Sequence, residues 1–205
     1  MLTIYGNRKS GSSNKVEYIA KILKLKYEYK DLDFQKDLKT PQYLKIHPVG
    51  KIPAIDDDGF ILFESGAIIR YLCDKQGHEL YPRDVKQRAL VDQWTDFVNL
   101  HVGTALGKIA YARIFAPMMG ALVDENAAQE GVALLNRFLP IIESQFQKHK
   151  FLVGNSLTLA DISLFAAFEY ADAAKVDLSG YKSLTAWRVS LMQMEFYTSM
   201  PPSKA

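Results

Sequence analysis

The chain has 205 residues, of which 48% are hydrophobic and 23% are charged. This length suits two modest domains better than one small domain, and the apolar content is sufficient for buried cores. With 25 Lys and Arg against 23 Asp and Glu, the net charge is only +2, which gives no general case for nucleic-acid binding, because that requires a concentrated basic face. The single cysteine, Cys73, excludes an intramolecular disulfide and a cysteine-based metal site.

The start of the chain has the character of a strand, Leu2 to Tyr5, and not of a basic segment followed by an apolar one. We therefore expect no signal peptide. No run approaches the roughly 18 apolar residues that span a bilayer, and the four histidines lack the spacing of metal ligands. These features predict a cytoplasmic protein without a metal and without a membrane or nucleic-acid partner.

Residues 1–78 predict a mixed α/β domain with the element order β-α-β-α-β-β-α. Apolar residues recur at helical spacing after Asn14 and after Ser65. The turn sequence Asp57-Asp58-Gly59 separates two short apolar runs, as in a hairpin. The predicted elements are a strand at 2–5, a helix from 14, a strand at 27–32, a short helix at 41–46, strands at 52–55 and 60–63, and a helix from 65.

A polar stretch containing a proline, residues 79–86, predicts a linker, and residues 87–205 predict an all-helical domain. Apolar residues there recur with helical spacing almost throughout. Thr158 and Asp161 have the form of a capping box at the start of one helix. Pro140 falls inside another helical pattern, where we expect it to kink or break the helix.

A cluster of serines, Ser10, Ser12 and Ser13, lies between the first strand and the first helix. At a helix N-terminus the unpaired N–H groups and the helix dipole favour negative charge. A thiolate would be stabilised there, and a serine O–H could donate a hydrogen bond to it. Lowering a thiol pKa by about two units requires roughly 2.7 kcal/mol, within reach of one charge-assisted hydrogen bond and a helix terminus. Ordinary helix capping by serine is the alternative interpretation.

A second candidate site surrounds Pro53. A proline at the start of a strand donates no hydrogen bond, and in the cis form it exposes the preceding peptide. The N–H and C=O of Ile52 could then pair with an extended peptide ligand. Eleven residues later, Ser65 is expected to cap the third helix, whose N-terminus suits an α-carboxylate, while Glu64 could hold an α-ammonium group.

Taken together, these motifs resemble the cytosolic glutathione S-transferase family, in particular bacterial-type members of the classes that use a serine. The resemblance covers nearly the whole chain: residues 41–72 resemble the glutathione-binding signature, and 154–161 the capping motif of the helical domain. It implies a thioredoxin-like N-terminal domain and an all-α C-terminal domain. It also implies a homodimer, with glutathione as co-substrate and no other cofactor.

The resemblance also implies roles for individual residues. Pro53 would be the family's cis-proline, and Ile52 would pair with the cysteinyl backbone of glutathione. Glu64 and Ser65 would hold the γ-glutamyl end. Lys39 and Lys51 match positions that contact the polar ends of the tripeptide, although both could equally be ordinary surface lysines.

The residue that activates the thiol is left open between Ser10 and Ser12. Lys15-Val16 matches an Arg-Val pair that is common in the serine-using classes, and counting back from it favours Ser10, as in phi- and zeta-like members. Counting from Gly11 favours Ser12, as in delta-like members. Ser13 or a backbone N–H is the remaining alternative.

The predicted reaction is attack of the glutathione thiolate on an electrophilic, mostly apolar small molecule. We expect the second substrate to bind between the domains, against the 101–119 segment, with Tyr111 and Phe115 as candidate contacts. Two alternatives remain on the same scaffold: a glutathione-dependent isomerase, peroxidase or dehalogenase, and a non-catalytic regulatory module that binds glutathione.

Overall fold

The computed structural model describes residues 1–201, which form two compact units. The first unit contains Met1–Arg83 and the segment that begins at Met194, and the second contains Asp84–Gln193. The sequence-based division instead places everything after residue 86 in the helical domain. The difference arises because α10 (Glu195–Thr198) packs on α1 (Gly11–Ile22). There the ring of Phe196 meets that of Tyr18 edge to face, with 5.2 Å between centroids.

The first unit has the predicted order βαβαββα, and the thioredoxin-like fold class is confirmed. The hairpin at Asp57-Asp58-Gly59 is also confirmed, with positive φ at Asp58 and Gly59. Apart from α1 and α10, its elements are β1 (Leu2–Gly6), β2 (Tyr27–Asp31), α2 (Pro41–Leu44), β3 (Ala54–Asp57), β4 (Phe60–Phe63) and α3 (Ser65–Gln76).

The four strands form one mixed sheet in the order β2-β1-β3-β4. β1 runs parallel to β2 and antiparallel to β3, and β3 runs antiparallel to β4. In this register Tyr5 pairs with Ala54, which also pairs with Phe63. The end of β1, the start of β3 and the end of β4 therefore meet at one edge of the sheet, and the segments carrying the predicted site residues begin there.

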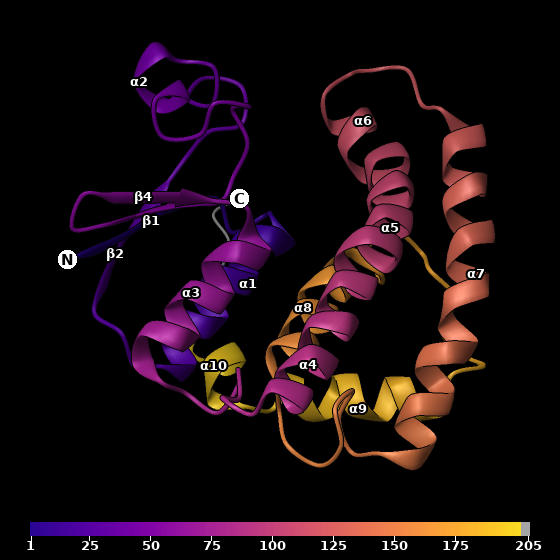
Figure 1. The fold of residues 1–205 in the computed structure, drawn as a ribbon. Coiled ribbons are helices and arrows are strands. Elements are labelled where there is room, and N and C mark those ends of the chain that lie inside the picture. Colours follow the sequence, from indigo (N-terminus) through magenta and orange to yellow (C-terminus); the bar gives the residue numbers. More distant parts are fainter. Residues whose placement is uncertain (202–205) are drawn as a thin grey trace. The chain divides into compact units, whose positions relative to one another are not determined.

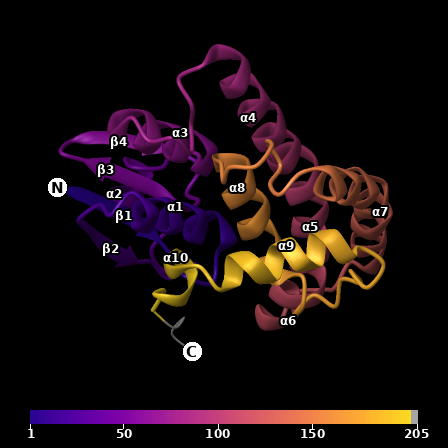
Figure 2. The same cartoon turned by 90° about the horizontal axis from the view of Figure 1, so that it is seen from below.

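Helices α1 and α3 lie side by side against one face of the sheet (Figures 1 and 2). Their apolar residues bury with the central strands, and Ile4, Ile19, Ile55 and Ile69 are completely inaccessible to solvent. This core fixes the N-terminal ends of both helices near the sheet. On the other side, α2 approaches β1 through the rings of Tyr43 and Tyr5, whose centroids are 6.2 Å apart.

The second unit is all-helical, as predicted. Its longest helix, α7, lies beside α5 (Figure 1), and Gly131 of α7 allows this close approach, because a Cβ there would lie 2.7 Å from the carbonyl oxygen of Ala105. The helices are α4 (Val85–Phe97), α5 (Gly103–Ala110), α6 (Ala116–Met118), α7 (Glu125–Lys148), α8 (Leu159–Ala167) and α9 (Lys182–Met192), with π-helical turns at Val98–Val102 and Tyr111–Phe115 and a 3-10 turn at Phe168–Tyr170.

Two local predictions in this unit have different outcomes. The capping box is confirmed, since Thr158 and Asp161 form it at the start of α8. Pro140 is expected to kink or break its helix; the helix is not broken, because α7 continues through it. Pro140 has no N–H to donate to the carbonyl of Asn136, four residues earlier. Both residues are exposed, so water can bind that carbonyl instead. Within residues 1–201, no helix is both long and apolar enough to cross a membrane.

Candidate active site

The serine cluster lies where β1 leads into α1, and Ser10 is the N-cap of this helix. The Ser10 Oγ accepts a hydrogen bond from the backbone N–H of Ser13, at 3.4 Å. Ser10 is half-buried and Ser12 is exposed, whereas Ser13 is completely buried. The Ser13 Oγ accepts a bond from the Asn7 N–H at 3.3 Å. Burial therefore leaves Ser10 and Ser12 as the accessible hydroxyls.

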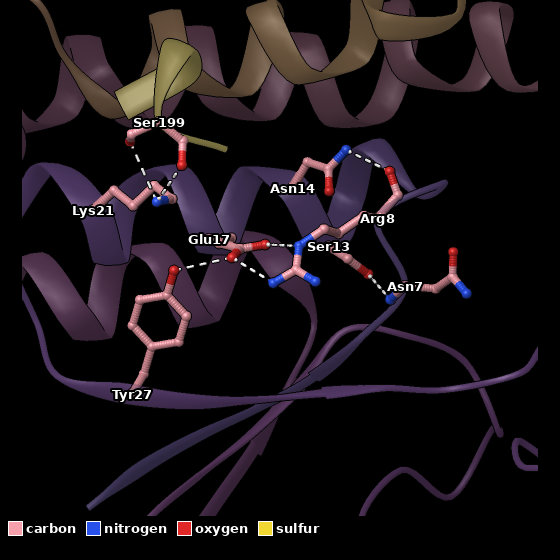
Figure 3. A network of polar contacts seen from close by, with 8 residues as sticks. All are labelled: Asn7, Arg8, Ser13, Asn14, Glu17, Lys21, Tyr27 and Ser199. Carbon is pink, nitrogen blue, oxygen red and sulfur yellow. Dashed lines mark hydrogen bonds and ion pairs between the residues drawn. The ribbon is translucent and has the colours of Figure 1, made fainter. Parts of the chain in front are cut away.

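A polar network holds the loop that leads to these serines (Figure 3). The Arg8 guanidinium donates to both carboxylate oxygens of Glu17, at 3.0 and 3.1 Å, and only 1% of the Glu17 side chain is exposed. The Tyr27 hydroxyl donates to the same carboxylate at 2.9 Å. The Asn14 side chain donates to the Arg8 carbonyl at 3.0 Å. Strand β2, helix α1 and the loop are thus tied together immediately before Ser10.

The segment before β3 forms a second part of the same sheet edge. The Ile52–Pro53 peptide bond is cis, and Ile52 is half-buried. The hydroxyl of Tyr43 donates to the Lys51 carbonyl at 2.7 Å, and Lys39 Nζ donates to the Val49 carbonyl at 2.9 Å. These bonds attach the loop to α2 and the segment before it, while both lysines remain exposed.

At the start of α3, Glu64 has a φ of 70°, a conformation that is costly for a residue with a side chain and that clusters at functional sites. Glu64 is exposed and is itself the N-cap of α3, without a side-chain capping bond. The expectation that Ser65 caps this helix is therefore wrong, because Ser65 is its first helical residue. With the preceding residue in a left-handed conformation, the Ser65 hydroxyl faces α1 and accepts a bond from Lys15 Nζ at 3.2 Å.

The electrostatic surroundings of His47 connect three of the predicted residues. His47 is buried, and its Nδ1 has no hydrogen-bond partner among residues 1–201. Burial lowers the pKa of His47, Glu64 raises it, and Lys51 and Lys39 lower it further. The structure thus brings Lys39, Lys51 and Glu64 into one electrostatic neighbourhood, with two cations and one carboxylate at its exposed rim.

The two residues predicted to contact a second substrate lie in the helical unit. Tyr111 is 52% exposed, and Phe115 packs edge to face on Tyr170, with ring centroids 5.3 Å apart. Neither lines the cavity of about 570 Å³ found in this unit. That cavity is bordered by Arg113, Val132, Leu135, Asn136, Lys175, Val176, Asp177, Ser179, Gly180 and Tyr181.

Lys15 is the residue at this site that sequence reasoning missed. It is 5% exposed on α1, and burial, followed by the nearby charge of Arg70, lowers its pKa to about 8. The nearby carboxylate of Glu64 raises this pKa. A lysine in a serine-rich polar segment gives no sequence signal of burial, although its match to a family arginine pointed to a special position.

The edge of the sheet therefore presents groups suited to an extended, zwitterionic peptide. Glu64 supplies a carboxylate for an ammonium group, and the α3 N-terminus beside Ser65 supplies donors for a carboxylate. The α1 N-terminus, with Ser10 and Ser12, supplies a favourable place for a thiolate. Among residues 1–201, no cluster of three or more His, Cys, Asp or Glu could hold a metal ion.

Comparisons with known proteins agree with this geometry. Residues 1–74 match the family model "Glutathione S-transferase, N-terminal domain", and residues 108–195 match "Glutathione S-transferase, C-terminal domain". The chain is 32% identical over 197 residues to a probable glutathione S-transferase, GSTF2, of Oryza sativa subsp. japonica, covering 93% of this chain and 91% of the relative.

Two solved structures extend the likeness to the three-dimensional fold. Glutathione transferase F2 from Populus trichocarpa superposes with a TM-score of 0.90 at 26% identity, covering 97% of this chain and 96% of the other. Glutathione S-transferase I from maize, in complex with an atrazine glutathione conjugate, gives 0.88 at 27% identity, covering 97% and 95%. The chain belongs to the glutathione S-transferase family.

Proposed function

We propose that this protein conjugates the thiolate of glutathione, its co-substrate, to electrophilic and mostly apolar small molecules. The observation that carries the proposal is the strained backbone of Glu64 beside Ser65, at the same sheet edge as Ser10 and Pro53. The maize relative with a bound glutathione conjugate supports the same chemistry.

In this proposal, glutathione binds in an extended conformation along this edge of the sheet. The backbone of Ile52 pairs with the cysteinyl residue in the manner of an added strand. Glu64 holds the γ-glutamyl ammonium group, and Ser65 with the α3 N-terminus holds the adjacent carboxylate. Lys39 and Lys51 contact the polar ends of the tripeptide, and their exposed ammonium groups support this assignment.

For thiol activation we assign the donor role to Ser10, with Ser12 as the alternative. The Ser10 Oγ already accepts a bond from the Ser13 N–H, so its own O–H remains available to donate to a thiolate. Ser12 is exposed, and within residues 1–201 its hydroxyl has no such orienting contact. This assignment makes the protein a serine-class transferase; its bacterial-type character stays a prediction.

The remaining assignments concern the second substrate and the assembly. We assign second-substrate contacts to Tyr111 and Phe115, supported by the exposure of Tyr111. The proposed homodimer is supported by the exposed aromatic side chains of Phe60 and Phe63 on β4, an edge strand of the sheet. The cytoplasm is the proposed location.

Calorimetric titration of glutathione into the wild type and Glu64→Ala tests the proposal, followed by conjugation of 1-chloro-2,4-dinitrobenzene with the same samples. We expect micromolar to millimolar binding and turnover in the wild type, with affinity reduced about tenfold or more in the variant. Binding without turnover of any electrophile would favour a regulatory module. Absence of glutathione binding would refute the proposed function.

A further inference from the structure

Lys15 connects the two ends of the proposed glutathione site. It lies on α1, the helix whose N-terminus carries Ser10, and its Nζ donates to the hydroxyl of Ser65 at the start of α3, at 3.2 Å. At 5% exposure it is a buried charged side chain. Lysines are rarely buried to this extent, because removing an ammonium group from water is costly.

We infer that Lys15 is a positioning residue that orients the Ser65 hydroxyl toward the γ-glutamyl carboxylate and makes glutathione affinity depend on pH. The inference rests on the proposed function, since it concerns the same ligand. It adds a residue and a pH response to that site.

The chemistry of the ammonium group fixes the direction of the hydrogen bond. An ammonium group can only donate, so the Ser65 oxygen is the acceptor in its bond with Lys15. The Ser65 proton is then free to point away from Lys15 and to donate to a ligand. Because its donor is cationic, this arrangement also strengthens the hydroxyl as a donor to a carboxylate. If Lys15 loses its proton, the neutral amine can accept instead, and the Ser65 proton can turn inward.

The charges around Lys15 set the pH at which this change occurs. Arg70 and Glu64, from α3 and its N-cap, are two charged groups that act on it. Burial and Arg70 bring the pKa of Lys15 down to about 8, against the effect of Glu64. The ammonium form is therefore complete near pH 6.5 and mostly lost by pH 9, so the affinity for the glutamyl carboxylate should fall across this interval.

The same charges predict proton uptake on binding. A ligand carboxylate beside Ser65 favours the ammonium form of Lys15, so binding near pH 8 should raise its pKa. By linkage, up to about half a proton is taken up per ligand when the pH equals the pKa of the free site. Glutathione's own amine and thiol also titrate in this range, so the experiment needs a blocked thiol and a variant with a permanent charge.

The test uses S-methylglutathione, whose thiol cannot ionise, and calorimetry at pH 6.5, 7.5, 8.2 and 9.0 in buffers of different ionisation enthalpy. The variants are Lys15→Arg, which keeps its charge over this range, Lys15→Met, and Lys26→Met as a control at an exposed lysine. Circular dichroism verifies folding. Should Lys15→Met fail to fold, the comparison of wild type with Lys15→Arg still decides.

We expect the affinity of the wild type to fall severalfold more between pH 7.5 and 9.0 than that of Lys15→Arg. Proton uptake near pH 8 should be larger in the wild type, and Lys15→Met should bind about tenfold more weakly at pH 6.5. Lys26→Met should match the wild type. Equal pH dependence and equal proton uptake in wild type and Lys15→Arg would overturn the inference while leaving the proposed function intact. No binding by the wild type at any pH would overturn both.

Discussion

The loop that carries Ser10 is held in place by the buried ion pair between Arg8 and Glu17, and Arg8→Met should free the loop. In the wild type, Glu17 is 1% exposed and receives two hydrogen bonds from Arg8 and one from Tyr27 (Figure 3). Removing Arg8 leaves a buried carboxylate whose remaining hydrogen-bond partner among residues 1–201 is Tyr27. Breaking one side of a buried pair costs about 3 kcal/mol or more.

The assay must report on the first unit. Both tryptophans, Trp94 and Trp187, lie in the second unit, so their fluorescence would follow the wrong part of the molecule. Amide hydrogen exchange in peptides from α1 measures the first unit directly. If opening free energy falls by about 3 kcal/mol, exchange from α1 accelerates about a hundredfold, because each 1.4 kcal/mol is a factor of ten.

A matched variant separates charge from packing. In Arg8→Met with Glu17→Gln, the buried charge is removed together with its partner, and the glutamine oxygen can still accept from Tyr27. We expect this double variant to recover most of the protection in α1. Less than threefold acceleration in Arg8→Met, or no recovery in the double variant, would refute the idea that this ion pair holds the loop.

Further predictions concern packing, capping and thiol reactivity. Gly131→Ala should destabilise the helical unit by about 1–3 kcal/mol in urea unfolding, because its Cβ would meet the Ala105 carbonyl at 2.7 Å. Gly107→Ala, in open space on α5, should stabilise by about 0.5–1 kcal/mol, and equal effects at the two sites would contradict this packing. Burial raises the pKa of Asp161 to about 6, above its unfolded value, so the contribution of Asp161 to stability should fall as the pH rises from 4 to 7. Asp161→Ala should flatten this pH dependence of stability, and an unchanged slope in the variant would contradict the prediction. Cys73 is buried, with its pKa raised to about 12, so iodoacetamide should label it only after unfolding, and rapid labelling of the native protein would show that the site is open.

The sequence was sufficient to predict the fold because short-range patterns determine each element. The hairpin follows from Asp58 and Gly59, which adopt the positive φ that the turn requires. The capping box at Thr158 and Asp161 fixes the start of α8. The strand register, which no local pattern states, then brings Ser10, Pro53 and Glu64 to one edge of the sheet.

What the sequence could not predict depends on contacts between distant segments. Lys15 lies on α1, which packs against α3, and 50 residues separate it from Ser65. The left-handed backbone of Glu64 shifts the cap by one residue, which propensity would not indicate. Pro140 is tolerated because the carbonyl it orphans is on the exposed side of α7.

The most direct test of the central claim is the pKa of the glutathione thiol in the complex, followed by thiolate absorbance near 240 nm. We expect the wild type to lower this pKa by about two units, Ser10→Ala to abolish most of the lowering, and Ser12→Ala to retain it. If Ser10→Ala lowered the thiol pKa as much as the wild type does, the assignment of Ser10 would be contradicted. If only Ser12→Ala failed to lower the thiol pKa, the role would belong to Ser12.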